Sequence, residues 1–284
     1  MNLKSPIKAM LAYDAAKKPI NYANGIYIQA KLDGCRCLIQ LDDNQEVVAY
    51  SRNHKEWMNI EHIKQELAPF FKQNPTTILD GELYNHALKE NFNKIISLVR
   101  KQKPTAEDRA EAKELVQFHC YDYIDHSSDD YSTRSANLTC ASFYSDYIKH
   151  VGNDKVHSFD EAKEFHAFFL KLGYEGSIIR LNGPYEQKRS YNLCKFKDFH
   201  DTEATITDFV VGKGKRTGTI GKFIGVDSEG QVIGIPVMGK QVELLANFEE
   251  MKTWVGEICT FTYFQRTPAG SYRHPLFKCI RNYE

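Results

Sequence analysis

The sequence has 284 residues, and its 37 Lys and Arg balance 37 Asp and Glu to a formal net charge of zero. This length favours two domains over one. The zero charge excludes a general attraction to nucleic acid, so such binding must come from local basic patches. No run of eighteen apolar residues occurs, residues 1–6 lack a signal-peptide core, and the seven cysteines form no CxxC pair. We therefore expect no membrane span, no disulfide framework, no zinc site and a cytoplasmic protein.

The first predicted elements are two strands on either side of Asp33-Gly34. An apolar, strand-forming run ends at Lys31 and another follows Arg36. Because Asp-Gly is a turn signal, the pattern predicts a hairpin from Tyr22 to Leu41. A lysine with its ordinary pKa of about 10.4 is protonated at neutral pH, so Lys31 could act as a nucleophile only where cations or burial lower that pKa. The alternative is a solvated surface hairpin.

The next elements alternate between strands and helices. The strand of residues 76–84 carries Asp80 and Glu82 two residues apart, so both carboxylates project from the same side. The strand of residues 117–124 contains Tyr121, which is either a purine-stacking ring or a core aromatic. The predicted strands and helices of this part cover residues 47–52, 59–71, 76–84, 92–100, 106–116 and 117–124.

Three charged residues mark the next part of the chain. Ser158 begins a predicted amphipathic helix that ends at Gly173. Glu175 then stands at the mouth of a buried strand, a position suited to Mg²⁺, which prefers carboxylate and water ligands. Lys195 and Lys197 share one face of the following strand, an arrangement that would place two cations on a triphosphate.

The composition changes after residue 198. Short strands at residues 203–211, 218–227, 232–236 and 254–263 are separated by glycines, with one helix expected at residues 247–253. This pattern predicts a small barrel of the OB type. Its basic loop at residues 212–218 suits a nucleic-acid backbone or is simply solvated. The loop lacks the Walker A spacing of a phosphate-binding P-loop.

Six short segments resemble, in order, the motifs of the covalent nucleotidyltransferases, which comprise ATP-dependent DNA ligases, RNA ligases and mRNA capping enzymes. A single motif of this kind would be weak support for the resemblance, whereas six motifs in the family's order are strong support for it. The tail from Ser271 to Arg281 departs from the RxDK form of motif VI, so the roles of its cations Arg273, Lys278 and Arg281 stay open. The matching segments are Lys31-Leu32-Asp33-Gly34-Cys35-Arg36 (motif I), Ser51-Arg52-Asn53 (Ia), Leu79-Asp80-Gly81-Glu82-Leu83 (III), Tyr121-Asp122 (IIIa), Glu175-Gly176-Ser177-Ile178-Ile179 (IV) and Cys194-Lys195-Phe196-Lys197 (V).

The resemblance implies an α+β fold of two domains. Residues 1–198 would form an adenylation domain of antiparallel sheets with flanking helices, and residues 199–284 an all-β OB-fold barrel. The implied function is an ATP-dependent DNA ligase that seals 5′-phosphate/3′-hydroxyl nicks in duplex DNA through lysyl-AMP and adenylated DNA. The alternatives are an RNA ligase, a capping guanylyltransferase that uses GTP, or a non-catalytic binding protein on the same fold.

The resemblance also implies roles for single residues. Lys31 would attack the α-phosphate of ATP, with Lys195 and Lys197 supplying positive charge and lowering the pKa of Lys31. Gln29 would accept a hydrogen bond from the adenine amino group, unless it faces solvent. The nucleotide would be bound by Gln29, Lys31, Arg36, Arg52, Glu82, Tyr121, Lys195 and Lys197.

The implied cofactors are ATP and Mg²⁺, with Mn²⁺ as a substitute. Glu82 and Glu175 would hold the metal. The implied partner is nicked duplex DNA, bound by a monomer in a bacterial or phage-infected cell and away from any membrane. Arg36 and Arg52 would hold the 5′-phosphate of the nick. The residues implied in DNA binding are Arg36, Arg52, Lys213, Lys215 and Arg216.

Overall fold

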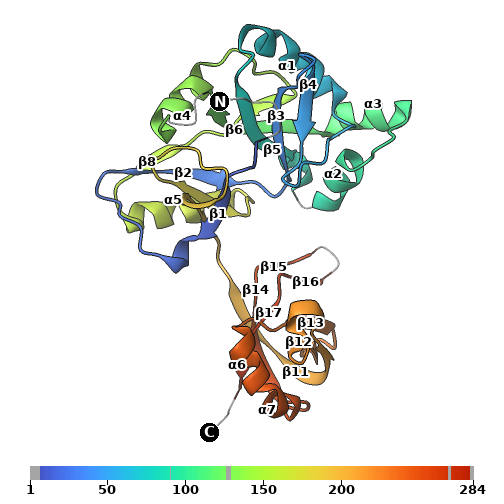
Figure 1. Cartoon of the computed structure of the whole chain (residues 1–284). Helices are drawn as coiled ribbons and strands as arrows, with labels where there is room; N and C mark the ends of the chain where they lie inside the picture. Colours follow the sequence, from blue (N-terminus) through green and yellow to red (C-terminus); the bar gives the residue numbers. More distant parts are fainter. Residues whose placement is uncertain (1–6, 90, 126–128, 268–269, 282–284) are drawn as a thin grey trace. The chain divides into compact units, whose positions relative to one another are not determined.

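The computed structural model describes residues 7–89, 91–125, 129–267 and 270–281. The chain forms two compact units, one ending at Lys197 and one beginning at Asp198 (Figure 1). Three five-stranded sheets and short helices make up a mixed α+β fold, as expected from the sequence. Within the described ranges, no helix has the length and apolar character needed to cross a membrane.

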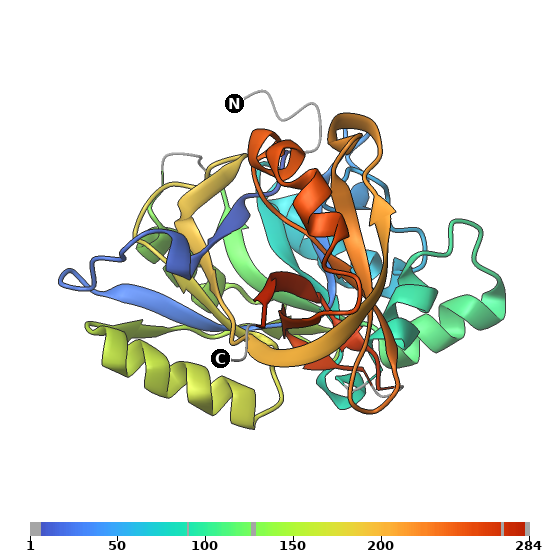
Figure 2. The same cartoon turned by 90° about the horizontal axis from the view of Figure 1, so that it is seen from below.

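The first sheet of the first unit has one long helix packed on it. Its core joins Ile28 and Ile179 of the strands to Ala162 and Phe169 of the helix. The helix α5 (Phe159–Lys171) begins as predicted, because the Ser158 hydroxyl accepts a hydrogen bond from the Glu161 N–H at 3.1 Å. Figure 2 shows α5 lying along this sheet. The strand order is β1 (Leu11–Asp14), β10 (Arg189–Phe196), β9 (Gly176–Arg180), β2 (Ile26–Lys31) and β8 (Asp154–Val156).

The second sheet carries the larger core of this unit. Buried side chains of α1, such as Leu67 and Phe71, pack on Leu79 and Phe118 of the strands. The strand order is β4 (Val47–Tyr50), β3 (Cys35–Leu41), β5 (Ile78–Tyr84), β6 (Gln117–Ile124) and β7 (Ile148–His150). The helices are α1 (Glu61–Gln73), α2 (Phe92–Val99), α3 (Ala106–Leu115) and α4 (Tyr131–Cys140), of which α4 was not predicted.

The predicted hairpin around Asp33-Gly34 is wrong. Strand β2 pairs with β8 and β9 in the first sheet, whereas β3 pairs with β4 and β5 in the second. The link between them therefore crosses from sheet to sheet. Gly34 lies so close to β5 that an added Cβ would be 2.5 Å from the Leu83 carbonyl oxygen. A glycine is therefore needed here because it lets the backbone of the link approach β5, and not only because it favours a turn. As a result, Lys31 and Arg36 stand on different sheets.

The second unit is built on one five-stranded sheet. Four of its strands, at residues 200–211, 220–226, 232–236 and 258–263, overlap the four predicted runs, but the second and fourth are shorter than expected. The helix α7 (Phe248–Lys252) lies within the predicted helix, whereas α6 (Gln241–Ala246) was not expected. Phe223, Ile235 and Phe261 form its core. In the described part of the chain, no strand pairing closes this sheet into a barrel. The order is β13 (Val232–Pro236), β12 (Ile220–Val226), β11 (His200–Val211), β14 (Ile258–Tyr263) and β17 (Leu276–Ile280), beside the pair β15 (Gln265–Arg266) and β16 (Tyr272–Arg273).

Candidate active site

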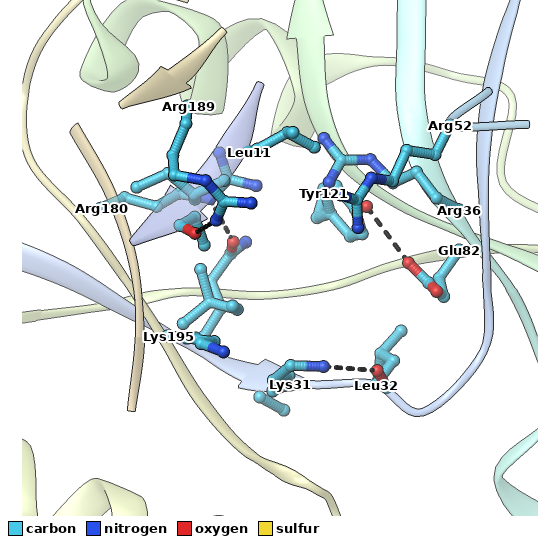
Figure 3. A pocket seen from close by; sticks show the side chains of 15 residues that line it. Leu11, Lys31, Leu32, Arg36, Arg52, Glu82, Tyr121, Arg180, Arg189 and Lys195 are labelled. Carbon is cyan, nitrogen blue, oxygen red and sulfur yellow. Dashed lines mark hydrogen bonds between the residues drawn. The ribbon is translucent and has the colours of Figure 1, made fainter. Parts of the chain in front are cut away.

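A cavity of about 310 Å³ in the first unit is lined by residues of both sheets. Six cationic side chains and a single carboxylate are among its described lining residues. The cavity therefore has the electrostatic character of a site for a polyanion. Figure 3 shows Lys31 near one end, with cavity side chains of the second sheet on one side and of the first sheet on the other. Seven of the predicted site residues line it, namely Gln29, Lys31, Arg36, Arg52, Glu82, Tyr121 and Lys195.

Lys31 ends strand β2 and is held there by Glu175. The Glu175 N–H donates to the Lys31 carbonyl at 3.0 Å. The Nζ of Lys31 and the Nζ of Lys197 each form an ion pair with a different oxygen of the Glu175 carboxylate, which is almost fully buried. An ion pair with a carboxylate favours the ammonium form of a lysine. The nucleophilic role of Lys31 stays a prediction, and it would require this pair to open and a proton to leave.

Lys195 and Lys197 were predicted to share one face of a strand, but Lys195 lies in β10 whereas Lys197 follows its last residue, and their surroundings differ. Lys197 pairs with Glu175, and its side chain is 9% exposed. Lys195 lines the cavity and is half-buried. Its side chain makes no hydrogen bond or ion pair with any other residue in the described part of the chain. Figure 3 shows it in the same cavity as Lys31. Lys195 is thus available to a bound anion without breaking a contact.

Glu82 and Tyr121 form a second group in the cavity. The Tyr121 hydroxyl donates to Oε2 of Glu82 at 3.2 Å. Burial raises the pKa of Glu82 to about 7, against the lowering effect of the Lys31 and Arg36 charges. The guanidinium carbons of Arg36 and Arg180 lie 5.2 and 5.3 Å from the centre of the Tyr121 ring. Tyr121 is therefore a cavity residue and not simply a core aromatic, and its stacking on a purine stays a prediction.

The two arginines predicted at the 5′-phosphate of a nick differ in freedom. Arg36 makes a bidentate ion pair with the fully buried Asp80 and donates to the Met10 carbonyl at 3.2 Å. Asp80 also accepts from the Tyr185 hydroxyl at 2.7 Å. Arg52 is exposed and has no polar partner among the described residues. Arg36 is therefore rigidly placed, whereas Arg52 is able to reorient toward a ligand.

Gln29 does not face solvent, so that alternative is wrong. Its side chain is 2% exposed. The amide nitrogen Nε2 donates to the Val151 carbonyl at 3.0 Å, and the oxygen Oε1 accepts from Nε of Arg180 at 2.6 Å. The adenine contact of Gln29 stays a prediction.

Two cavity arginines were missed by sequence reasoning. Arg180 ends β9 and is 3% exposed, and Arg189 begins β10 and donates to the Ala12 carbonyl. A charged residue directly after the apolar run Ser177-Ile178-Ile179 was a usable signal for Arg180. No comparable signal marks Arg189, because it lies in a polar stretch.

The basic loop of the second unit holds cations of two kinds. The side chains of Lys213 and Lys215 are exposed and make no hydrogen bond or ion pair with other described residues. Arg216 is half-buried and donates from Nη1 to the Val237 carbonyl at 2.6 Å. Arg216 therefore anchors the loop, and its DNA contact stays a prediction. In the tail, Lys278 pairs with Asp201 and Arg281 with Glu203, so both have roles inside this unit.

Two carboxylates, Glu82 and Glu175, were predicted to hold a magnesium ion. In the described part of the chain, no three residues of the types His, Cys, Asp and Glu come together as a metal site. Mg²⁺ is commonly held by one or two carboxylates together with phosphates and water. Glu82 lines the cavity and suits such a site, whereas both oxygens of Glu175 are paired with lysines, so its role as a metal ligand stays a prediction.

Comparison with known proteins covers most of the chain. A family model described as "ATP dependent DNA ligase domain" matches residues 8–197. The DNA ligase of African swine fever virus is 32% identical over 202 residues, which is 68% of this chain but only 46% of the viral protein. The chain thus spans about half the length of that relative. The DNA ligase of Haemophilus influenzae is 26% identical over 223 residues, covering 75% of this chain and 76% of that protein.

Solved structures share the fold of the chain. A structure of Lig E DNA ligases superposes with a TM-score of 0.76 at 23% identity, covering 96% of this chain and 99% of that one. The ATP-dependent DNA ligase of bacteriophage T7, in complex with ATP, gives a TM-score of 0.55 at 19% identity and covers 99% of this chain and 100% of that one. At these identities the likeness concerns the fold.

Proposed function

Because this chain belongs to the ATP-dependent DNA ligase family, we propose that it is itself an ATP-dependent ligase, which seals nicks between a 5′-phosphate and a 3′-hydroxyl in duplex DNA. The observation that carries the proposal is the cavity, in which a lysine at a strand end lies among cations suited to a triphosphate. The family match and the cavity support each other, because every residue that lines the cavity lies within the matched residues 8–197 of the first unit.

Lys31 is the proposed nucleophile. Its Nζ attacks the α-phosphate of ATP, a P–N bond forms, pyrophosphate leaves, and the amine loses its proton. The AMP group then passes to the 5′-phosphate of the nick, and the 3′-hydroxyl displaces AMP to form the phosphodiester. In-line placement of Nζ, phosphorus and the leaving oxygen supplies much of the rate.

Lys195 is the proposed cation at the α-phosphate, because it lines the same cavity as Lys31 and its side chain has no polar partner among the described residues. Lys197 acts through Glu175, to which it is bound. Glu82 and Glu175 would hold Mg²⁺ or Mn²⁺, which when bound supplies charge neutralisation at the phosphates. Tyr121 offers its ring to the purine, while Arg52, with Arg36 behind it, binds the 5′-phosphate of the nick.

We assign residues 1–198 as the adenylation domain and residues 199–284 as an OB-fold domain, which together act on DNA as a monomer. The two compact units, which divide between Lys197 and Asp198, and the five-stranded sheet of the second unit support this assignment. Lys213 and Lys215 would contact the DNA backbone from the anchored loop, because they are exposed cations without a described partner. Arg216 would hold the loop and face the same backbone.

The test is incubation of the protein with α-labelled ATP and Mg²⁺, followed by nicked duplex DNA. We expect label on the protein, its transfer to DNA and a sealed strand. Parallel reactions with labelled GTP and with broken RNA distinguish a capping guanylyltransferase and an RNA ligase. A folded protein that takes no label from either nucleotide would contradict the proposal.

A further inference from the structure

The Gln29 side chain is held in one of its two amide orientations. A backbone carbonyl can only accept a hydrogen bond, and an arginine can only donate one. Gln29 lies between these two kinds of group, the Val151 carbonyl at 3.0 Å and Nε of Arg180 at 2.6 Å. Only the orientation with the amide nitrogen toward Val151 and the oxygen toward Arg180 satisfies both. A rotated amide would face a carbonyl with its oxygen and an N–H with its own N–H, which is costly for a buried group.

Arg180 is in turn held by a buried carboxylate. Its Nη1 donates to Oδ2 of Asp122 at 2.8 Å, and its guanidinium lies 4.8 Å from the centre of the Tyr131 ring. Asp122 has no exposed surface, and Arg180 is 3% exposed. Arg180 thus uses separate nitrogens for Gln29 and for Asp122, so the position of the carboxylate determines how Nε meets the glutamine oxygen.

The outermost member of this chain of contacts is Arg134 on helix α4. Its Nε donates to Oδ1 of Asp122 at 2.8 Å, and its Nη1 donates to the carbonyls of Asp129 at 2.6 Å and Gly183 at 3.1 Å. Arg134 is 1% exposed and is not among the residues that line the cavity. Its Nη2 also donates to Oδ2 of Asp122 at 3.4 Å, so Arg134 contacts both carboxylate oxygens and shares Oδ2 with Arg180. Without Arg134, the carboxylate would keep the Tyr123 N–H at Oδ1 and Arg180 at Oδ2, and it would be free to tilt and draw Nε of Arg180 away from Gln29.

We propose that Arg134 is a positioning residue for base selection, acting through Asp122 and Arg180 to keep the Gln29 oxygen, rather than its amide nitrogen, available to the purine. The proposal rests on the proposed function, with ATP as the nucleotide in the cavity. Adenine carries an amino group at its six-position, which donates to the fixed oxygen, whereas guanine carries an oxygen there. A rotated Gln29 would present an N–H group, which fits guanine and opposes adenine.

The test compares nucleotide choice in two variants, Arg134→Lys and Arg134→Met. Lysine keeps a buried cation but has one donor group in place of the guanidinium fork. For each, KM and kcat of protein labelling are measured with α-labelled ATP and GTP, after thermal unfolding has verified the fold. We expect the ratio of KM for GTP to KM for ATP to fall on the order of tenfold, the size of one mismatched hydrogen bond. The matched control is Arg109→Met, at an exposed arginine outside this network.

A second pair of variants separates positioning from general loosening. Gln29→Leu removes the group that reads the base, so adding Arg134→Lys to it should leave the KM ratio where Gln29→Leu alone puts it. Two results would overturn the proposal while leaving ligase activity established. One is an unchanged ratio of KM for GTP to KM for ATP in folded Arg134→Lys. The other is a change of this ratio by Arg134→Lys in the Gln29→Leu background that is as large as its change in the wild-type background. Failure of the wild-type protein to take label from ATP would overturn the proposed function instead.

Discussion

The carboxylate of Glu175 forms an ion pair with Nζ of Lys31, two residues that stand 144 positions apart in the sequence. Glu175 has a side chain only 4% exposed and also carries Lys197 on its other oxygen. The proposed nucleophile is therefore fixed at its position by the same acid that would hold the metal.

Replacing this acid tests both roles. Glu175→Gln keeps the shape but removes the charge that balances two partly buried lysines, so we expect a loss of about 1–3 kcal/mol in the free energy of unfolding. Lysyl-AMP formation should fall by at least about tenfold, since the amine loses the contact that positions it and the site loses the acid that would hold the metal. Chemical denaturation and labelling with α-labelled ATP measure the two effects. Glu164→Gln, at an exposed position of α5, is the control. Normal stability together with normal labelling would show that the ion pair has neither role.

Lys31→Ala should abolish labelling of the protein by ATP. Its fold should persist, because Glu175 keeps Lys197 as a partner. The variant should still seal a nick that is supplied already adenylated, since that step requires no lysine nucleophile. Gel assays of protein label and of strand joining provide the measurements. Label that stays covalently attached to the Ala variant would show that another residue is the nucleophile.

The basic loop should bind the DNA backbone without reading its sequence. Lys213→Ala/Lys215→Ala removes two exposed cations, so nick affinity should fall and the slope of log affinity against log salt should flatten by up to about 2 units. Protein labelling by ATP should stay near the wild-type rate. Arg216→Ala should instead loosen the loop, because it removes the hydrogen bond to the Val237 carbonyl. A loss of labelling with normal DNA affinity in the double variant would place the loop at the nucleotide.

The start of helix α4, which carries Arg134, should weaken in acid. The Thr133 N–H, the Ser132 hydroxyl and the Asn182 amide all donate to the Asp130 carboxylate. Hydrogen bonds from Thr133 and Ser132 lower the pKa of Asp130 to about 2, against about 3.9 in an unfolded chain.

Because the folded pKa is the lower one, the charge of Asp130 stabilises the protein fully above about pH 4, and this stabilisation is lost as the pH falls toward about 2. Asp130→Asn keeps the cap but removes the charge. Its deficit in unfolding free energy should be less than about 1 kcal/mol at neutral pH, since the site is open to solvent, and should shrink in acid. Denaturation midpoints at several pH values measure this, and a deficit that is independent of pH would contradict it.

The sequence alone determined the local elements and the chemistry to look for. Residue spacing located the helix capped by Ser158 and the strand that ends at Lys31, because capping and side-chain alternation act over a few neighbouring residues. The order of the motifs led to Lys31, Glu82 and Lys195, all of which line one cavity.

Only the tertiary structure decided how these elements meet. Asp33-Gly34 gives the same turn signal whether it links a hairpin or a crossover between two sheets. The crossover forms because β2 pairs with β8 and β9, which lie over a hundred residues away along the chain. The surroundings of Gln29 were likewise decided by distant parts of the chain. Its side chain contacts Arg180, which contacts Asp122, which in turn contacts Arg134, and these three residues lie on three other elements. Local propensity acts between neighbours in sequence, whereas pairing of strands and burial of charge depend on partners that only the folded chain brings together.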